Sequence, residues 1–557
     1  MVSILNSFLC SCSFWLQVLS QDRPVNFPQN IRITTGNFHN WAEDINVKNL
    51  WIALPKTEND VVTLANWASQ NNYKLRALGY MHNWSPLTVT EVNNKDNVVL
   101  VNTTVNLKNI KKPIKISPSK YAVVAQTGAS MLQLLTFLED NGMGMYSGPA
   151  LGDLTVGGAL AIGGHGAGVP AVGETIPPGF ALGTISNLIL SFKAVVWDSA
   201  NNEFILKTFQ RSDADANAFL VNFGRTFITE VTLMVGLNYN LRCESSTTLT
   251  SDELFASVPG PKTFSHFLDK SGRVETIAFP STTRPWLKVW TIASKKPSTS
   301  RHVTAPFNYP IIENVPEKII TLFKETAKGN ASQASKLGRT ELAAVEMNLL
   351  KTKSHDLWGP SKNLMLYVKQ SILKHTENGY AIITTRANVQ KVLHSFDVNL
   401  KALVDSYKEI GRYPLNGPVV IRTTSVDESN VVDNSEPPTL SAIQPVNGHP
   451  EYDTVVWINV LSISKSYDLF EAFSKLETFM WNEYNGTYAI IRPEWSKGWA
   501  YTNNDVWSNS RIYRNVIPSL FSNSTVSKWN WAINTLNKYD PNRIFTNSFL
   551  DEFLRPV

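Results

Sequence analysis

The chain has 557 residues, too many for one compact core, and its length suggests two large domains or about three of ~150 residues each. Hydrophobic residues make up 43% and charged residues 17% of it, which is typical of globular proteins and excludes the disordered class. The formal net charge of +5 is mild, and nucleic-acid binding, which needs clustered Lys and Arg, is not indicated.

The first segment is apolar from Phe8 to Leu19 and predicts a secretory signal peptide over residues 1–20. Val18–Ser20 suits a small-residue cleavage rule, although no Lys or Arg precedes Arg23 to provide the usual basic start. We therefore expect a secreted protein, whose cleaved form would keep Cys243 as its one cysteine and could form no internal disulfide. No later run of 18 apolar residues predicts a membrane span.

Strand and helix patterns alternate from about residue 40 to about residue 240. A helix is predicted to begin at Thr57–Asp60, and a second helix over 129–142 is capped by Ser130 and ended by Gly142. Apolar runs predict the strands, at residues 75–78, 98–102, 121–128, 187–197 and 226–235.

Ten glycines fall between Gly142 and Gly168, a density that indicates close backbone approach or positive φ angles. The Walker phosphate-binding pattern does not occur, and Pro149 makes the strand-to-helix turn of a dinucleotide-binding Rossmann site improbable. Two turn-forming segments, Leu78–Leu87 and Leu154–Gly168, remain, and their N–H groups could bind a pyrophosphate. The alternative is that the glycines only permit tight packing.

From residue 245 to about 490, long strands alternate with helices. Strands are predicted at 275–280 and 364–368, and helices at 387–394 and 467–484. The polar, proline-bearing stretch 427–445 predicts a surface loop. The tail, residues 529–557, closes the chain.

Five ionisable or amide side chains stand out in this second half. Arg422 and Asn459 interrupt or follow apolar strand runs, where a polar group is costly unless it is paired or functional. Glu275 lies in a predicted strand whose alternation can put its carboxylate on the face opposite its neighbours. Glu494 and Lys497 flank Trp495 and are three residues apart, so they can share one turn. The structural alternatives are a buried Arg422–Glu275 ion pair, a surface Glu494–Lys497 pair and a satisfied core amide at Asn459.

Four segments of the first half, in this order and spacing, resemble the vanillyl-alcohol-oxidase superfamily of FAD enzymes. They are residues 49–57, 78–87 ("LGYMHNWSPL"), 154–168 and 222–233. Segments of the second half are similar to the type II cholesterol oxidases, which carry covalent FAD. These segments are residues 272–290, 355–363, 416–424, 454–461 and 492–502. The resemblance runs from about residue 40 to residue 551, and "RPEWSKGWAY" is far more specific than any glycine pattern.

The resemblance implies an α+β, two-domain vanillyl-alcohol-oxidase fold. An FAD-binding domain of the PCMH type would span 40–240 and be completed by 500–557, and a substrate domain over 245–495 would contain a large mixed or antiparallel sheet covered by helices. His82 occupies the position at which the superfamily links flavin covalently, and His165 is the alternative link. Without the resemblance, His82 would be a turn histidine bonded to a nearby carbonyl. The other residues implied to bind FAD are Gly79, Tyr80, Met81, Asn83, Ser85, Pro86, Gly148, Leu154, Thr155, Gly157, Gly158, Gly164, His165, Gly168, Ile228 and Asn547.

The activity implied is oxidation of a sterol 3β-hydroxyl, as in cholesterol, by O2 to give a ketosteroid and H2O2, with hydride transfer to flavin N5. Arg422 would stabilise the flavin charge and act in an oxygen gate, and Glu275 or Glu494 would accept the hydroxyl proton. Asn459 and Lys497 would orient the hydroxyl. We expect no metal and no nucleic acid, and we expect peripheral contact with membranes or lipid particles.

One position departs from the family pattern. Val420 stands two residues before Arg422, where the steroid oxidases have a glutamate, so Glu275 would have to pair with Arg422 or the gate would work differently. This departure leaves open a sugar, alditol or other bulky-alcohol oxidase of the same fold, or a flavin-binding protein without turnover.

Overall fold

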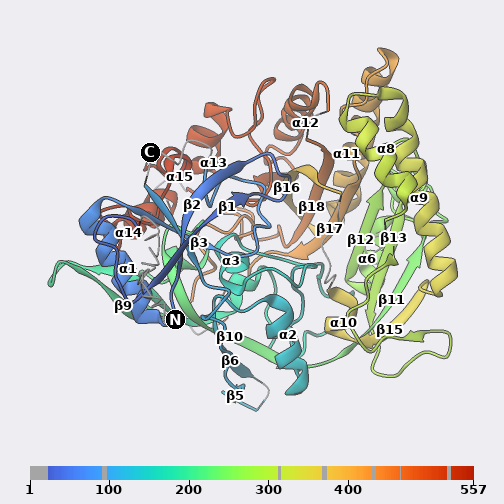
Figure 1. The fold of residues 1–557 in the computed structure, drawn as a ribbon. Helices are drawn as coiled ribbons and strands as arrows, with labels where there is room; N and C mark the ends of the chain where they lie inside the picture. Colours follow the sequence, from blue (N-terminus) through green and yellow to red (C-terminus); the bar gives the residue numbers. More distant parts are fainter. Residues whose placement is uncertain are drawn as a thin grey trace, which may run out of the picture.

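The computed structural model describes residues 23–556, apart from 91–96, 119, 311–314, 367–372, 430, 432–434, 465 and 523–527. The predicted signal peptide therefore lies outside the described residues. The chain forms three β-sheets with helices packed on them, and its last helices lie beside its first strands (Figure 1). None of the helices within these ranges is long and apolar enough to cross a bilayer.

The first strands form a four-stranded sheet in the order β1-β2-β4-β3. Its strands are β1 (Arg32–His39), β2 (Asn46–Leu54), β3 (Lys74–Leu78) and β4 (Val98–Asn102). Helix α1 (Glu58–Asn71) connects β2 to β3, and both of these strands run parallel to β4. The predicted start of α1 is confirmed, because the Thr57 hydroxyl accepts the Asp60 N–H and the Asp60 carboxylate accepts the Thr57 N–H.

A six-stranded sheet follows in the order β5-β6-β10-β8-β9, and β7 pairs with β10. Helix α1 packs against β8 and β9 of this sheet as well as against β3. The strands are β5 (Ile114–Lys115), β6 (Tyr121–Gln126), β7 (Met143–Gly144), β8 (Ile189–Asp198), β9 (Glu203–Gln210) and β10 (Phe227–Leu237). The helices of this region are α2 (Met131–Asp140), α3 (Val156–Ala161), η2 (Ile185–Leu188) and α4 (Asn217–Leu220). Ser130 caps α2 and Gly142 follows it with a φ of 72°, as predicted.

The second half is built on a nine-stranded sheet in the order β14-β15-β11-β13-β12-β17-β18-β16-β19. Its strands are β11 (Asn240–Ser246), β12 (Arg273–Ala278), β13 (Trp286–Ile292), β14 (Arg301–His302), β15 (Asp356–Pro360), β16 (His375–Thr384), β17 (Val419–Ser425), β18 (Thr454–Ile463) and β19 (Ala489–Pro493). All neighbouring pairs are antiparallel except β14 with β15. The predicted α+β class, with a large mainly antiparallel sheet, is confirmed.

Helices cover this large sheet. Helix α6 packs against β12 and β13, both α8 and α11 contact β18, and α8 packs along α9 at the edge of the molecule (Figure 1). The helices are α5 (Ser251–Leu254), α6 (Phe264–Ser271), α8 (Glu317–Ala327), α9 (Ala331–Thr352), α10 (Ser361–Met365), η3 (Arg386–Asn388), α11 (Val389–Glu409) and α12 (Leu469–Glu483).

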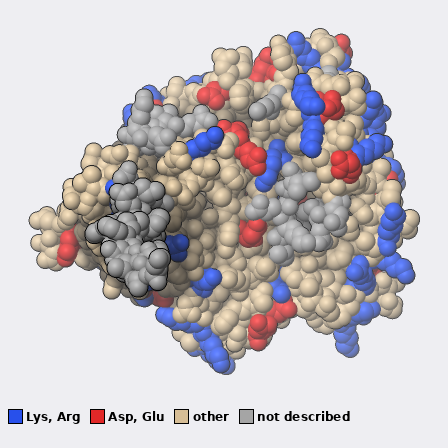
Figure 2. Space-filling view, viewed as in Figure 1, with Lys and Arg blue, Asp and Glu red and all other residues tan. Residues whose placement is uncertain are grey.

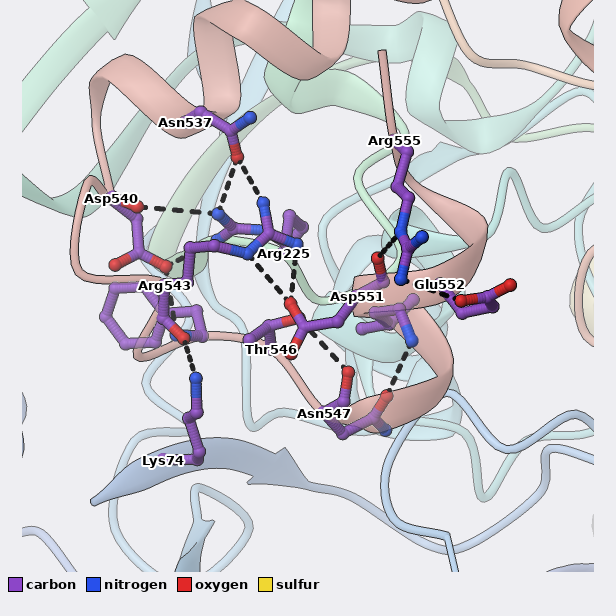
Figure 3. A network of polar contacts seen from close by, with 12 residues as sticks. Lys74, Arg225, Asn537, Asp540, Arg543, Thr546, Asn547, Asp551, Glu552 and Arg555 are labelled. Carbon is purple, nitrogen blue, oxygen red and sulfur yellow. Dashed lines mark hydrogen bonds and ion pairs between the residues drawn. The ribbon is translucent and has the colours of Figure 1, made fainter. Parts of the chain in front are cut away.

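The C-terminal segment returns to the first two sheets. It contains η4 (Ile512–Val516), α13 (Ile517–Ser519), α14 (Lys528–Lys538) and α15 (Ser548–Phe553). Between α14 and α15, Asp540 forms a buried ion pair with Arg225 (Figure 3). Asp540 also accepts the N–H of Ile544, whose carbonyl accepts the N–H of Leu75 in β3 at 2.8 Å. The C-terminal segment is therefore joined to β3 through the protein interior.

Three sequence-based predictions are wrong. Residues 364–368 do not begin as a strand, because Leu364 lies in α10, and 367–368 lie outside the described residues. The segment 154–168 is not only a turn, since Thr155 caps the short helix α3. The described residues of the stretch 427–445 do not form a surface loop, because most of them are buried and Asp427, Leu440 and Ile443 are fully buried. Its polar groups bond to buried partners: Thr184 donates to the Asp427 carboxylate, and Arg492 donates to main-chain carbonyls.

Candidate functional site

The loop after β3 places His82 at the wall of a cavity. Met81 adopts a φ of 58°, which turns the chain sharply before the histidine, and such a turn brings successive N–H groups together. The His82 imidazole stacks on Trp41, with ring centroids 4.6 Å apart, and its Nε2 lies 3.0 Å from the Asp153 carboxylate. The imidazole is therefore held in one orientation from two sides.

The second half of the same loop is anchored to the segment that carries Glu494 and Lys497. The N–H groups of Trp84 and Ser85 both donate to the Ser496 carbonyl, and the Ser85 hydroxyl donates to the Trp495 carbonyl at 2.9 Å. On the other side, the Asn547 amide donates to the Pro86 carbonyl at 2.9 Å. These bonds fix the position of His82 relative to the charged side chains described below.

Glycines let the second predicted turn segment pack closely against its neighbours. A Cβ atom on Gly79 of the first segment would lie 2.7 Å from the Thr155 hydroxyl of the second, and one on Gly157 would lie 2.8 Å from Thr127 Cβ, just after β6. Both distances are too short for real contacts, so each position requires glycine. The segments 78–87 and 154–168, far apart in the sequence, thus meet along one wall.

The cavity between these segments and the large sheet has a volume of about 490 Å³, within the usual range for ligand pockets. Most of the predicted site residues line it: Gly79, Tyr80, Met81, His82, Asn83, Leu154, Thr155, Gly157, Gly158, Gly164, His165, Ile228, Glu275, Arg422, Glu494 and Lys497. Six others do not: Ser85, Pro86, Gly148, Gly168, Asn459 and Asn547. Of these, Ser85, Pro86 and Asn547 anchor the His82 loop, and Gly168 is bonded to β17.

At the sheet end of the cavity, three carboxylates meet three cations. Arg422 Nε lies 3.7 Å from the Glu275 carboxylate, which also accepts from Lys288 at 2.5 Å. Lys497 Nζ lies 2.9 Å from Glu377 and 3.9 Å from Glu494. All six side chains are largely buried, and their three negative and three positive formal charges cancel inside the protein.

Asn459 links these charged groups although it does not itself line the cavity. Its amide donates to Glu494 at 2.7 Å, and its carbonyl accepts from Arg422 at 3.3 Å. His165 Nε2 lies 3.5 Å from Glu494, and its ring stacks on Trp457 with centroids 3.6 Å apart. The predicted site residues of the second half therefore form one connected cluster.

Burial and neighbouring charges give the ionisable groups different proton affinities. Burial lowers the pKa of His165, although the adjacent Glu494 opposes this effect, so the imidazole is neutral near pH 7. Burial raises the pKa of Glu377, and the charge of Glu494 adds to the rise while Lys497 opposes it. Burial also disfavours ionisation of Glu494, but Lys497, His165 and Arg422 outweigh it and hold the pKa of Glu494 well below its usual range.

Sequence reasoning missed three charged residues of the cavity: Arg76, Lys288 and Glu377. Lys288 interrupts the apolar run of β13, and the same pattern in the sequence identified Arg422. In the structure Lys288 is fully buried. Glu377 is the third residue of β16 and lies within a polar run, where the sequence does not distinguish it from an exposed carboxylate. Arg76 stands in a short strand whose burial depends on the returning C-terminal segment.

Arg76 is a hub for the cavity wall. All five of its N–H groups donate to main-chain carbonyls, and these carbonyls belong to Leu87, Thr88, Phe223, Gly224 and Phe545. The guanidinium is 3% exposed, and within the described part of the chain it forms no ion pair. It joins the far end of the His82 loop, the 223–224 turn and the C-terminal segment at a single point.

The residues present fit FAD. The wall around Met81 and Gly163, both with positive φ, exposes main chain suited to a pyrophosphate, and the mainly apolar lining suits a flat ring. The site also places imidazoles and cations on the cavity wall, and cations there favour a negatively charged ring. The donor set is thus that of a flavin site.

Comparison with known proteins agrees with this chemistry. A family model described as "FAD binding domain" matches residues 50–176, and one described as "Cholesterol oxidase, substrate-binding" matches residues 240–555. A solved structure of a solvent-stable cholesterol oxidase is 42% identical, with a TM-score of 0.93 over 96% of this chain and 100% of that chain. Cholesterol oxidase from Brevibacterium sterolicum is 38% identical, with a TM-score of 0.93 over 96% and 99% of the two chains. A histidine-to-alanine variant of that enzyme gives 38% and 0.92 over the same shares. A search of curated protein sequences gave no match.

The fold and the site define an FAD-dependent oxidoreductase that acts on CH–OH groups with oxygen as acceptor. Within that class, the chain belongs to the cholesterol oxidase family whose FAD-binding domain is of the PCMH type. The predicted family, fold class and requirement for FAD are thereby confirmed.

Replacing Arg76 with Met should strongly destabilise the protein, because five main-chain carbonyl oxygens would each lose one donor, with Asn547 left as a second donor to the Leu87 carbonyl. We expect a loss of roughly 3–5 kcal/mol in the free energy of unfolding, measured by thermal and urea denaturation. Lys74→Met is the matched control on the same strand, since Lys74 donates one bond, to the Arg543 carbonyl at 2.9 Å, and its loss should cost about 1 kcal/mol. Equal losses in the two variants would contradict the role of Arg76 as a hub.

Proposed function

We propose that this protein oxidises the 3β-hydroxyl of a sterol such as cholesterol, using O2 and releasing H2O2, with FAD linked to His82. The observation that carries the proposal is the single cavity that extends from His82 to the cluster around Arg422, Glu494 and Lys497. A sterol needs a large apolar pocket with a few polar groups at one end, and this distribution of residues meets that need.

FAD, when bound, supplies the hydride acceptor and the means of reducing oxygen. The chain supplies orientation and charge. Lys497 is held by Glu377 and lies over the Trp84 ring at 3.7 Å, so its ammonium group can point a donor at the substrate hydroxyl. Asn459 fixes Glu494 and Arg422 relative to each other, and we propose that the Arg422 cation stabilises negative charge on the reduced cofactor.

The residue that accepts the hydroxyl proton should be a carboxylate whose pKa is raised towards neutral pH. The sequence offered Glu275 or Glu494. The Lys497 cation, a hydrogen bond with the neutral His165 and the Arg422 cation make Glu494 a weak base. Glu275 is engaged by Lys288. We propose Glu377 instead, because its pKa is raised and its partner Lys497 is the same group that would hold the hydroxyl.

Oxygen access is the second role proposed for Arg422. Glu275 and Arg422 are paired in register across β12 and β17 and form an ion pair. Glu275 thus supplies the carboxylate partner of Arg422, since this chain has Val420 where the family pattern has a glutamate. A smaller cavity of about 40 Å³ touches both side chains, together with Gly148, Arg273 and Trp290. We propose that movement of this pair controls passage of oxygen.

Three broader expectations complete the proposal. We divide the chain into an FAD-binding domain over 40–240, completed by 500–557, and a substrate domain over 245–495. Secretion with cleavage near residue 20 is tested by N-terminal sequencing of the natural protein. Peripheral contact with membranes or lipid particles would bring the enzyme to its substrate.

Peroxide release tests the activity. Purified enzyme should release H2O2 with 3β-hydroxysteroids at a kcat/KM at least about a hundredfold above that with alditols, because the apolar cavity cannot pair several hydroxyl groups. A coupled peroxidase assay with cholesterol, a 3α-hydroxysteroid and an alditol measures this ratio. Preference for the alditol would overturn the sterol assignment and leave the flavin site standing.

The covalent link can be tested separately. His82→Ala should abolish the flavin that stays with the protein after acid precipitation, while FAD bound without a covalent link can remain. His165→Ala is the control, because His165 also lines the cavity and should leave acid-stable flavin in place. Absorbance of the acid pellet near the flavin maximum is the measurement. Acid-stable flavin in the His82 variant would move the link elsewhere.

Glu377→Gln should lower kcat by about 10²-fold or more with little change in KM, since Gln cannot accept a proton. In the parent enzyme, kcat/KM should fall as the pH drops below the raised pKa of Glu377, because the carboxylate becomes protonated, and this acid limb should vanish in the variant. Steady-state assays across pH measure both effects. Glu275→Gln is the comparison variant; if it alone abolishes the acid limb, Glu275 is the proton acceptor.

A further inference from the structure

A short hairpin at the edge of the six-stranded sheet has an unusual surface. The segment 108–120, here called the basic hairpin, contains β5 and leads into β6, and the registers Ile114–Ala122 and Lys115–Tyr121 hold it to the sheet. Main-chain bonds between Ile116, Ser117 and Lys120 close its turn. The hairpin is therefore a fixed projection from the domain.

Positive charge is concentrated on this projection. It carries five lysines, which are Lys108, Lys111, Lys112, Lys115 and Lys120, and the sequence has no Asp or Glu from residue 97 to residue 138. Across the described part of the chain, Lys111 is the one member of the five with an ion pair, to Glu230 at 2.9 Å. Lys and Arg side chains gather at the lower edge of Figure 2, where Figure 1 places β5. The five lysines of this one hairpin carry as much positive charge as the net charge of the whole chain, which is +5.

Two large apolar side chains accompany the lysines. Ile114, in β5, is 61% exposed, and Ile116, in the turn that follows, is 53% exposed. If the hairpin carried lysines alone, they could be explained as a device that keeps the exposed sheet edge from pairing with strands of other chains. Exposed isoleucines at a sheet edge increase that hazard, so edge protection does not account for them.

We propose that the basic hairpin docks this protein on anionic phospholipid bilayers, with the lysines at the headgroups and Ile114 and Ile116 inserted at the acyl boundary. Clustered lysines are attracted to a negative membrane surface, and apolar side chains beside them can be buried in the bilayer. A purely ionic partner such as nucleic acid would leave these apolar side chains exposed to water. The proposal assigns the membrane contact to one surface and one lipid class. It depends on neither the substrate nor the flavin chemistry.

Vesicle flotation tests the docking. The full-length protein should float with vesicles of phosphatidylcholine containing phosphatidylglycerol and should remain behind with pure phosphatidylcholine. Ile114→Ser with Ile116→Ser, and separately Lys112→Glu with Lys115→Glu, should each lower the partition coefficient by on the order of tenfold or more. Unchanged melting temperature and unchanged peroxide release from detergent-solubilised sterol would show that the variants are folded and active.

Helix α9 offers a matched control. Met347 is 52% exposed and Leu350 is 72% exposed, and the exposed Lys351 lies beside them, so Met347→Ser with Leu350→Ser removes similar apolar surface elsewhere. This control should float like the parent protein. Equal loss of flotation in the control, no loss in the isoleucine variant, or equal flotation with uncharged vesicles would each overturn the proposal.

Discussion

The return of the C-terminal segment to the first sheet is the constraint on which the site depends. Asp540, deeply buried against Arg225, fixes the turn that follows α14 (Figure 3), and that turn supplies the carbonyls bound by Leu75 and Arg76. Asn547 then reaches the Pro86 carbonyl. The His82 loop is thus held by residues more than 450 positions later in the chain, so the C-terminal segment completes this wall of the cavity. An unpaired Asp540 or Arg225 would leave a buried charge, which makes this contact intolerant of change.

The cavity also depends on buried ion pairs, and it contains more charged groups than the Asp540–Arg225 contact. Burying six ionised side chains is costly, and ion pairs in protein interiors do not by themselves add stability. Here the groups are shared rather than simply paired: Lys497 lies between Glu377 and Glu494, and Glu275 lies between Lys288 and Arg422. Lys497 therefore keeps a partner if one of its two carboxylates is protonated, and Glu275 likewise has two cationic partners. Such a network is suited to moving one proton without exposing the site to water, because the low dielectric strengthens every remaining interaction.

Much of this organisation could be predicted from the sequence because local signals were strong. Thr57 and Ser130 mark helix starts, and polar residues inside apolar strands identified Arg422 and Asn459 without structural information. The buried stretch 427–445 could not be predicted, since its polar composition is typical of a loop and its burial depends on partners such as Arg492. Glu377 was missed for a related reason: in a polar run, nothing in the sequence distinguishes a buried carboxylate from an exposed one. Tertiary context decides both cases.

Val420 shows how a departure from a family pattern can leave the pairing of a neighbouring cation in place. The side chain lines the cavity where the steroid oxidases of the resemblance have a carboxylate, yet Arg422 still faces Glu275 across the neighbouring strand. Replacing a carboxylate with valine removes one negative charge, and the six remaining groups balance three against three. It also adds apolar surface to the wall. A pocket that gains aliphatic lining while keeping its cations becomes less suited to a polyhydroxylated substrate and better suited to a sterol, because each unpaired hydroxyl in an apolar site carries a desolvation penalty.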